Sequence, residues 1–196
     1  MAQLVFLVLL IFPTLVLANV GLPMLAVAWP LSAPAFIPVV IIESWVVRRA
    51  LGISWSSATT QMLKANFIST LVGIPLAWVI SVAAEFSLAI LIVNTTDSRS
   101  YPPPGLGEVG NVILTAPWLG PINQGANWIL PLAMIVLLVP FFLVSFWIEA
   151  WYVGRHLCPE TPNQARLAIW KANAYSYTSL LIVTACWLIF GLLEPA

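Results

Sequence analysis

Two glutamates, at positions 43 and 149, are the side chains of this sequence with the clearest capacity for chemistry. Each stands inside a long apolar stretch, within the segments IIESW and WIEAW. A carboxylate at such a depth in a bilayer is costly and persists only when it is protonated, hydrated or paired. Two such groups therefore raise the question of whether they bind a cation, carry protons or hold helices together.

Basic and amide side chains follow both glutamates at distances that differ by one residue, and together they form the candidate site: Glu43, Lys64, Asn66, Glu149, Lys171 and Asn173. We predict that each glutamate pairs with the lysine or the asparagine of the next helix in its own hairpin. Polar contacts between membrane spans contribute about 0.6 to 2 kcal/mol, which is enough to set register. The alternative is that the two carboxyl groups line a shared wet cavity and carry protons or bind a cation.

An internal duplication relates the two halves of this candidate site. The segments PAFIPVVIIESWVVRRAL, from residue 34, and PFFLVSFWIEAWYVGRHL, from residue 140, share identical residues at an offset of 106 positions. Among them are Pro34/Pro140, Phe36/Phe142, Glu43/Glu149, Trp45/Trp151, Val47/Val153, Arg49/Arg155 and Leu51/Leu157. After one inserted residue the match resumes at Lys64-Ala65-Asn66 and Lys171-Ala172-Asn173, and Ser69 matches Ser176. Because the matched types include Pro, Glu, Trp, Arg, Lys and Asn, we interpret the segments as two copies of one helical hairpin.

Interfacial anchors stand beside each glutamate. Arg49 and Arg155 lie six residues after the glutamates, which places each carboxyl about 9 Å deeper at a rise of about 1.5 Å per residue. Tryptophan and arginine are enriched at membrane interfaces. We predict that these anchors lie at the cytoplasmic interface: Arg48, Arg49, Trp45, Arg155 and Trp151.

The composition explains why these polar residues need a membrane around them. The 196 residues are 61% hydrophobic and 7% charged, whereas a soluble domain carries about 25% charged residues. Long unbroken apolar runs predict helices and not barrel strands. The fold class is therefore all-α integral membrane, with about five transmembrane helices that include the two hairpins as parallel repeats.

The expected spans cover 4–29, 34–51, 61–93, 128–157 and 166–193. They divide the chain into an N-terminal transmembrane segment (1–30), hairpin repeat 1 (31–95), an external Pro/Gly-rich loop (96–127) and hairpin repeat 2 (128–196). Pro30, Pro34 and Pro38 should kink or interrupt the start of the second span. Two parallel hairpins predict a pseudo-two-fold axis along the membrane normal.

The basic residues predict the orientation. Six of the seven flank the short loops 52–60 and 158–165, and only Arg99 lies in the long loop. Positive-inside counting places the short loops in the cytoplasm, and with them the amino end, while the long loop and the carboxyl end lie outside. Val16-Leu17-Ala18 resembles a signal-peptidase site, but the preceding residues lack a basic region. The amino end is therefore cytoplasmic unless it is cleaved.

No recognised catalytic, nucleotide-binding or haem-attachment motif occurs, and a single histidine argues against a metal site or bis-histidine haem. The formal net charge is zero, without a basic stripe for nucleic acid. We predict no enzyme activity, no cofactor and no metal. The preferred interpretation is an accessory or scaffold subunit of a larger membrane complex in a bacterial plasma or thylakoid membrane. Its partners are the lipid bilayer and other membrane proteins or further copies of the chain. The alternative is a small oligomeric proton- or cation-coupled transporter or channel that uses the paired intramembrane glutamates.

Overall fold

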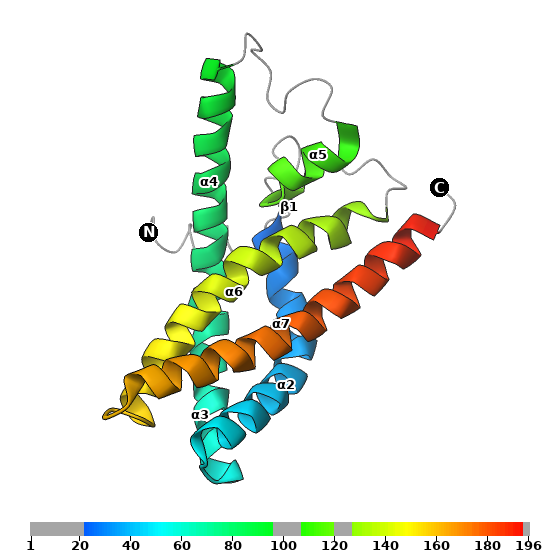
Figure 1. Ribbon diagram of the computed structural model, residues 1–196. Coiled ribbons are helices and arrows are strands. Elements are labelled where there is room, and N and C mark those ends of the chain that lie inside the picture. The colour runs from blue at the N-terminus through cyan, green and yellow to red at the C-terminus, as the bar shows by residue number, and fades with distance from the viewer. Residues whose placement is uncertain (1–21, 96–106, 120–126, 194–196) are drawn as a thin grey trace, which may run out of the picture. The chain divides into compact units, whose positions relative to one another are not determined.

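A computed structural model describes residues 22–95, 107–119 and 127–193 (Figure 1). Nearly all of them are helical. In chain order the elements are β1 (Leu22–Pro23), α2 (Met24–Leu51), α3 (Trp55–Ile68), the π-helical segment η2 (Ser69–Gly73), α4 (Ile74–Thr95), α5 (Gly107–Leu114), β2 (Trp118–Leu119), α6 (Ile129–His156) and α7 (Pro162–Leu193).

Four helical segments of the described chain are long and apolar enough to cross a membrane: Pro30–Leu51, Trp55–Thr95, Ile129–His156 and Pro162–Leu193. A span needs roughly 20 apolar residues. The protein is therefore an all-α, multi-pass membrane protein, as its composition predicts. The 41 residues of Trp55–Thr95 amount to roughly 60 Å of helix at about 1.5 Å per residue, more than a bilayer core requires.

The second predicted span begins earlier than expected. Helix α2 starts at Met24 and continues through all three prolines, Pro30, Pro34 and Pro38, without a break in helical structure. A missing proline N–H affects the carbonyl four residues earlier, and membrane helices tolerate such losses. The boundary expected at residue 30 thus falls within a helix, while residues 1–21, including Val16-Leu17-Ala18, lie outside the described part.

The turn that joins α2 to α3 is shorter than the predicted loop 52–60. It consists of residues 52–54, and α3 already begins at Trp55. Gly52 adopts a φ of 66°, and its N–H donates to the carbonyl of Arg48 at 3.0 Å, which closes α2. The Ser54 hydroxyl accepts from the Ser57 N–H at 3.2 Å and caps α3. Local capping chemistry therefore sets this turn.

In the turn between α6 and α7, a proline and not a serine cap marks the start of the second helix. Helix α7 begins with Pro162, a residue that suits the first helical position because its missing N–H has no partner there. The carbonyl of Thr161 accepts from the Gln164 N–H at 3.1 Å. Figure 1 shows that each pair of helices, α2 with α3 and α6 with α7, is joined by such a short turn.

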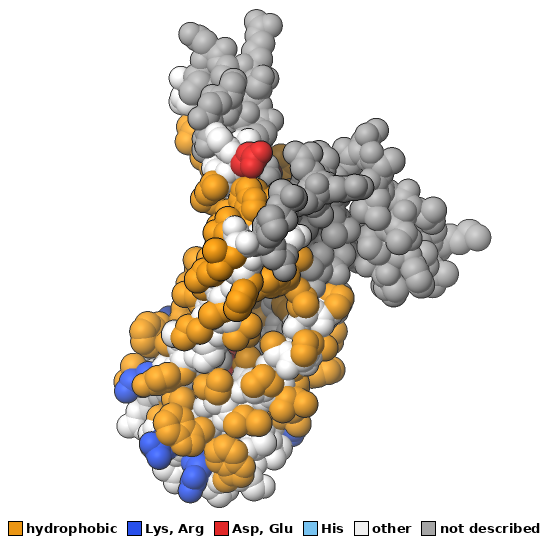
Figure 2. Space-filling model, turned by 90° about the vertical axis from the view of Figure 1, so that its right-hand side faces the viewer, with side chains coloured by type: hydrophobic (Ala, Val, Ile, Leu, Met, Phe, Trp, Pro, Cys, Tyr) orange, Lys and Arg blue, Asp and Glu red, His pale blue; other side chains and the backbone are white. Residues whose placement is uncertain are grey.

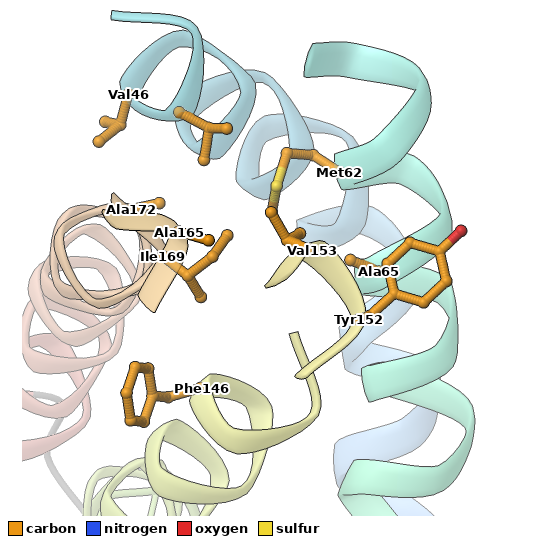
Figure 3. Packing of buried hydrophobic residues seen from close by; sticks show 10 residues of the cluster. Val46, Met62, Ala65, Phe146, Tyr152, Val153, Ala165, Ile169 and Ala172 are labelled. Carbon is orange, nitrogen blue, oxygen red and sulfur yellow. The ribbon is translucent and has the colours of Figure 1, made fainter. Parts of the chain in front are cut away.

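The chain forms two compact units. The first, named the Glu43 unit, comprises residues 31–77 and 138–183. Its core combines side chains of α2, α3, α6 and α7: Val46, Val47, Met62, Ala65, Phe146, Tyr152, Val153, Ala165, Ile169 and Ala172. In Figure 3, Met62 and Val153 point toward each other from α3 and α6. The three alanines among them allow close helix approach, as is usual in membrane bundles.

The second compact unit, named the Trp78 unit, contains the described residues before 31, between 78 and 137, and after 183. Leu22 and Pro23 of β1 pair antiparallel with Leu119 and Trp118 of β2. Trp78 on α4 donates its indole N–H to the Pro117 carbonyl at 3.0 Å and packs edge-to-face on the Trp118 ring, with centroids 5.2 Å apart. The segment predicted as a long external loop therefore contains the short helix α5 and a two-residue strand.

Candidate functional site

Glu43 and Glu149 are buried within the Glu43 unit. Glu43 on α2 is 0% exposed and Glu149 on α6 is 1% exposed. Both positions follow from the helical period, because the core residues Val46, Val47 and Val153 lie one turn further along the same faces. A buried carboxyl needs hydrogen-bond partners or a neutralising proton or cation.

Each glutamate accepts a hydrogen bond from the asparagine of its own hairpin. Asn66 Nδ2 on α3 donates to Glu43 Oε2 at 2.5 Å, and Asn173 Nδ2 on α7 donates to Glu149 Oε2 at 2.7 Å. Of the two partners expected for each glutamate, a lysine or an asparagine, the asparagine makes the contact. Lys64 and Lys171 lie at exposed positions, and lysine side chains of that kind extend toward the membrane interface.

Two serines cross between the hairpins. Ser176 Oγ on α7 donates to Glu43 Oε1 at 2.6 Å, and Ser69 Oγ on η2 donates to Glu149 Oε1 at 2.8 Å. Each carboxyl is therefore held by one amide from its own hairpin and one hydroxyl from the other. In the sequence these serines stand out only as a matched pair in the alignment of the two hairpins, which does not predict their crossing role.

The two carboxyl groups also contact each other. Glu43 and Glu149 are close enough to repel each other when both are ionised and to share a hydrogen bond when one is protonated. Two buried carboxylates in contact cannot both stay fully charged without a proton or a cation between them. The site thus combines the own-hairpin pairing expected of a structural role with the closeness of two carboxyl groups expected of a proton or cation site.

Backbone carbonyls complete the network. The second amide hydrogen of Asn66 reaches the Met62 carbonyl at 3.0 Å, and that of Asn173 reaches the Ile169 carbonyl at 3.2 Å. Each serine hydroxyl also lies 3.1 Å from the carbonyl of the asparagine three residues earlier. In this part of the described structure, the buried oxygens Asn173 Oδ1 and Ser44 Oγ have no hydrogen-bond partner.

A tyrosine lies beside the network. Tyr177 on α7 donates its hydroxyl to Ser145 Oγ on α6 at 3.0 Å, and its ring packs edge-to-face against Phe142 with centroids 5.3 Å apart. Tyr177 also interacts electrostatically with both glutamates. It follows Ser176 directly, so one turn of α7 contacts both Glu43, through Ser176, and Ser145, through Tyr177.

A glycine lets η2 approach α6. A Cβ added at Gly73 would lie 3.3 Å from Ile148 Cδ1 and 3.6 Å from Val144 Cγ1. Segments of π-helix insert an extra residue into a turn and often occur at functional sites. Here the π-helical segment begins at Ser69, the residue that bonds Glu149.

The predicted interface anchors contact one another in pairs. The guanidinium carbon of Arg49 lies 4.2 Å from the centre of the Trp45 ring, and that of Arg155 lies 4.9 Å from the Trp151 ring. Arg48 similarly faces Trp55 at 6.0 Å. Such cation–π contacts suit an interface that is wet on one side and apolar on the other. In Figure 2 the Lys and Arg side chains group together on the visible face, beside hydrophobic side chains.

The remaining candidate ligands are separate. His156 Nδ1 lies 2.7 Å from the Tyr152 carbonyl, and its ring stacks on Tyr152 with centroids 4.3 Å apart. Cys158 is half-buried and Cys186 is exposed. Among the described residues, no three His, Cys, Asp or Glu side chains gather as a metal would need.

The chemistry within reach of this site is proton or cation binding, or the mutual hydrogen bonding of four helices. Its donors are two amides and two hydroxyls, and its acceptors are two carboxyl groups. Comparison of the chain with protein-family models, with curated proteins and with solved structures finds no match.

Proposed function

We propose that this multi-pass membrane protein is a non-catalytic accessory or scaffold subunit of a larger membrane assembly. The observation that carries the proposal is the crossed network, in which Glu43 and Glu149 each bond a residue of both hairpins. The bonded residues are the matched pairs of the two hairpins, Glu43/Glu149, Asn66/Asn173 and Ser69/Ser176. As part of the proposal, the unit arose by duplication of one hairpin. A bundle held in this way presents a fixed outer surface.

The outer surface is suited to lipid and to other membrane helices. Large apolar side chains of the Glu43 unit point outward, among them Ile37 at 67% exposed, Phe67 at 60% and Trp147 at 60%. Aromatic residues are enriched in the central contacts of protein interfaces. The polar groups of the network, in contrast, are directed inward and bonded to one another.

Purification from native membranes in mild detergent tests the scaffold proposal. We expect a stoichiometric membrane-protein partner on native gels, identified by mass spectrometry. Phe67→Ala and Trp147→Ala remove outward aromatic side chains without touching the network, so at least one of them should weaken that complex while the chain stays folded. A chain that purifies only as itself, unchanged by both substitutions, would count against the proposal.

A second candidate is a small oligomeric proton- or cation-coupled transporter, and the contact between the two carboxyl groups favours it. Glu43→Gln with Glu149→Gln keeps the shape of both side chains and removes their titratable protons. If the parent shows a proton or cation flux in liposomes and the folded double variant loses it, the transporter replaces the scaffold. An equal flux, or none from either protein, leaves the scaffold as the better account.

A further inference from the structure

The serine hydroxyls of the network have more acceptors than protons. Ser69 Oγ lies 2.8 Å from Glu149 Oε1 and 3.1 Å from the Asn66 carbonyl, yet a hydroxyl carries one hydrogen. Ser176 Oγ faces the same choice, 2.6 Å from Glu43 Oε1 and 3.1 Å from the Asn173 carbonyl. Each hydroxyl can therefore donate to the carboxyl group or to the carbonyl, but not to both at once.

The choice matters because it follows the charge of the carboxyl. An ionised carboxylate only accepts hydrogen bonds, so the serine must donate to it. A carboxylic acid can donate instead, and the serine can then accept that proton while its own hydrogen turns to the backbone carbonyl. Both arrangements satisfy every oxygen of the serine–carboxyl contact, and both use the positions of the heavy atoms as they stand.

An unpartnered oxygen at the same place points to a proton donor as well. Asn173 Oδ1 is buried and has no hydrogen-bond partner, although the nitrogen of the same amide bonds Glu149. A turn of this amide by 180° exchanges its oxygen and nitrogen. The oxygen would then accept from a protonated Glu149 Oε2, while the amide nitrogen would give up its bonds to Glu149 and to the Ile169 carbonyl.

We propose that the Glu43–Glu149 pair is a proton-binding site, and that Ser69 and Ser176 are positioning residues whose hydroxyls switch between donating to and accepting from the two carboxyl groups. The ligand is a proton, bound by one carboxyl oxygen of the pair in the interior of a four-helix unit, where each carboxyl group faces a serine hydroxyl. One proton on the pair leaves one negative charge, and two protons leave none.

The proton balance is simple. When the pair takes up a proton from solvent, one Glu oxygen becomes a hydroxyl and donates to the facing serine, whose hydrogen turns to the backbone carbonyl. When the proton returns to solvent, the serine turns back and donates to the carboxylate. No bond between heavy atoms forms or breaks.

Few other charged or titratable groups share this interior. Polar side chains reach it from every element of the unit: Glu43 and Ser44 from α2, Asn66 from α3, Ser69 from η2, Ser145 and Glu149 from α6, and Asn173, Ser176 and Tyr177 from α7. Among the described residues, Tyr177 is the further titratable group that interacts with both carboxyls. Lys64 and Lys171 are exposed on the same helices, so neither neutralises the pair in the described structure.

Isotope-edited infrared spectroscopy of the purified chain, with glutamate labelled by ¹³C, tests the proposal directly. A protonated carboxyl has a C=O stretching band that is separate from the bands of carboxylates and shifts in D₂O. Because Glu85 also lies in a membrane span, all spectra use a Glu85→Gln background. We expect the band at neutral pH in that background and its loss in the Glu43→Gln/Glu149→Gln variant, whereas Glu160→Gln in the α6–α7 turn should leave it unchanged.

The serines are tested by the position of the same band. Ser69→Ala with Ser176→Ala removes the groups that accept from the carboxylic acid, so the band should shift. Ser69→Thr with Ser176→Thr restores the hydroxyls and should return it toward the parent position. A purely structural serine would change the melting temperature but leave the band where it is, and that outcome overturns the switching role.

The proton site itself is overturned if the Glu85→Gln background shows no carboxylic acid band that is absent from the Glu43→Gln/Glu149→Gln variant. Should the double variant fail to fold, the spectrum of the background alone still decides, because absence of any protonated glutamate band at neutral pH contradicts the proposal. The result is independent of partner binding and of flux. A scaffold and a transporter could each contain this site, so failure here is distinguishable from failure of either proposed function.

Discussion

At the scale of single residues, each buried glutamate is held from two sides. It receives an amide hydrogen from one hairpin and a hydroxyl hydrogen from the other. Removing one partner of a buried group costs more than the bond itself contributes, because the group left behind is neither solvated nor bonded. The four donors are therefore expected to matter more for stability than any exposed charge of the unit.

Asn66→Ala and Asn173→Ala test this expectation. Each leaves a glutamate oxygen without its amide donor, and we expect each to lower the free energy of unfolding by about 1 to 3 kcal/mol. Lys64→Ala is the matched control on the same helix as Asn66, because its side chain is exposed, and its effect should stay within about 0.5 kcal/mol. Denaturation in detergent followed by circular dichroism measures all three. Equal effects of Asn66→Ala and Lys64→Ala would contradict the assignment of partners.

A double-mutant cycle tests the crossing contacts. Glu43→Gln and Ser176→Ala affect groups 2.6 Å apart, whereas Ser69 bonds the other glutamate. We expect a coupling free energy of about 0.5 to 3 kcal/mol for Glu43 with Ser176, and a smaller one for Glu43 with Ser69. Chemical denaturation of the single and double variants gives both values. Ser69 belongs to the same hairpin as Glu43. Stronger coupling of Glu43 with Ser69 than with Ser176 would show that the serine–glutamate bonds do not cross between the hairpins.

At the scale of elements, three helical glycines experience different surroundings. A Cβ at Gly154 on α6 would meet nothing within 4 Å, and one at Gly73 on η2 would lie 3.3 Å from Ile148 Cδ1. At Gly191 on α7, within the Trp78 unit, the added carbon would lie 2.7 Å from the Asn127 carbonyl oxygen. The same substitution therefore probes open space, a flexible side chain and a rigid backbone.

The stability of the three alanine variants should fall in the order Gly154→Ala, Gly73→Ala, Gly191→Ala. Gly154→Ala should stabilise the protein by up to about 1 kcal/mol, since alanine has the higher helix propensity. Gly73→Ala should be close to neutral, because the end of Ile148 can move. Gly191→Ala should destabilise by about 1 to 3 kcal/mol, as overpacking does. Melting temperatures measured in one detergent check the order, and destabilisation by Gly154→Ala would contradict it.

At the scale of the whole molecule, the orientation in the membrane stays a prediction of the basic residues. Arg48, Arg49, Arg155 and Arg166 stand at helix ends next to the two short turns and face aromatic rings there. Positive residues are retained on the cytoplasmic side. Both turns are therefore expected in the cytoplasm and the segment between α4 and α6 outside.

Single cysteines at Ser56 and Glu108, in a chain with Cys158 and Cys186 replaced by alanine, test this topology. Glu108 is preferable to its neighbour Gly107, whose φ of 71° would strain any other residue. A membrane-impermeant thiol reagent should label Glu108→Cys in intact cells and Ser56→Cys only after the membrane is opened. Labelling of both from one side would exclude the parallel arrangement of the hairpins.

Much of the fold could be predicted from the sequence because it is local. A membrane helix satisfies its own backbone, so a long apolar run identifies it without knowledge of its neighbours. The residues that match between the two hairpin segments likewise suggested Glu43 and Glu149, with the lysines and asparagines of the next helices, as the candidate site. Helix capping is local too. The loop predicted at 52–60 was too long, because Gly52 ends α2 and Ser54 caps α3, so that the turn covers only 52–54.

What only the tertiary structure decided is which copy of each residue meets which. Both hairpins carry the same Glu, Asn and Ser, so the sequence cannot distinguish a serine that bonds its own hairpin's glutamate from one that bonds the other. The choice depends on how four helices pack, which places Ser176 on Glu43 and Ser69 on Glu149. Packing likewise leaves Lys64 and Lys171 exposed and brings the two carboxyl groups together, since the lysines lie on a different side of their helices from the asparagines two residues later.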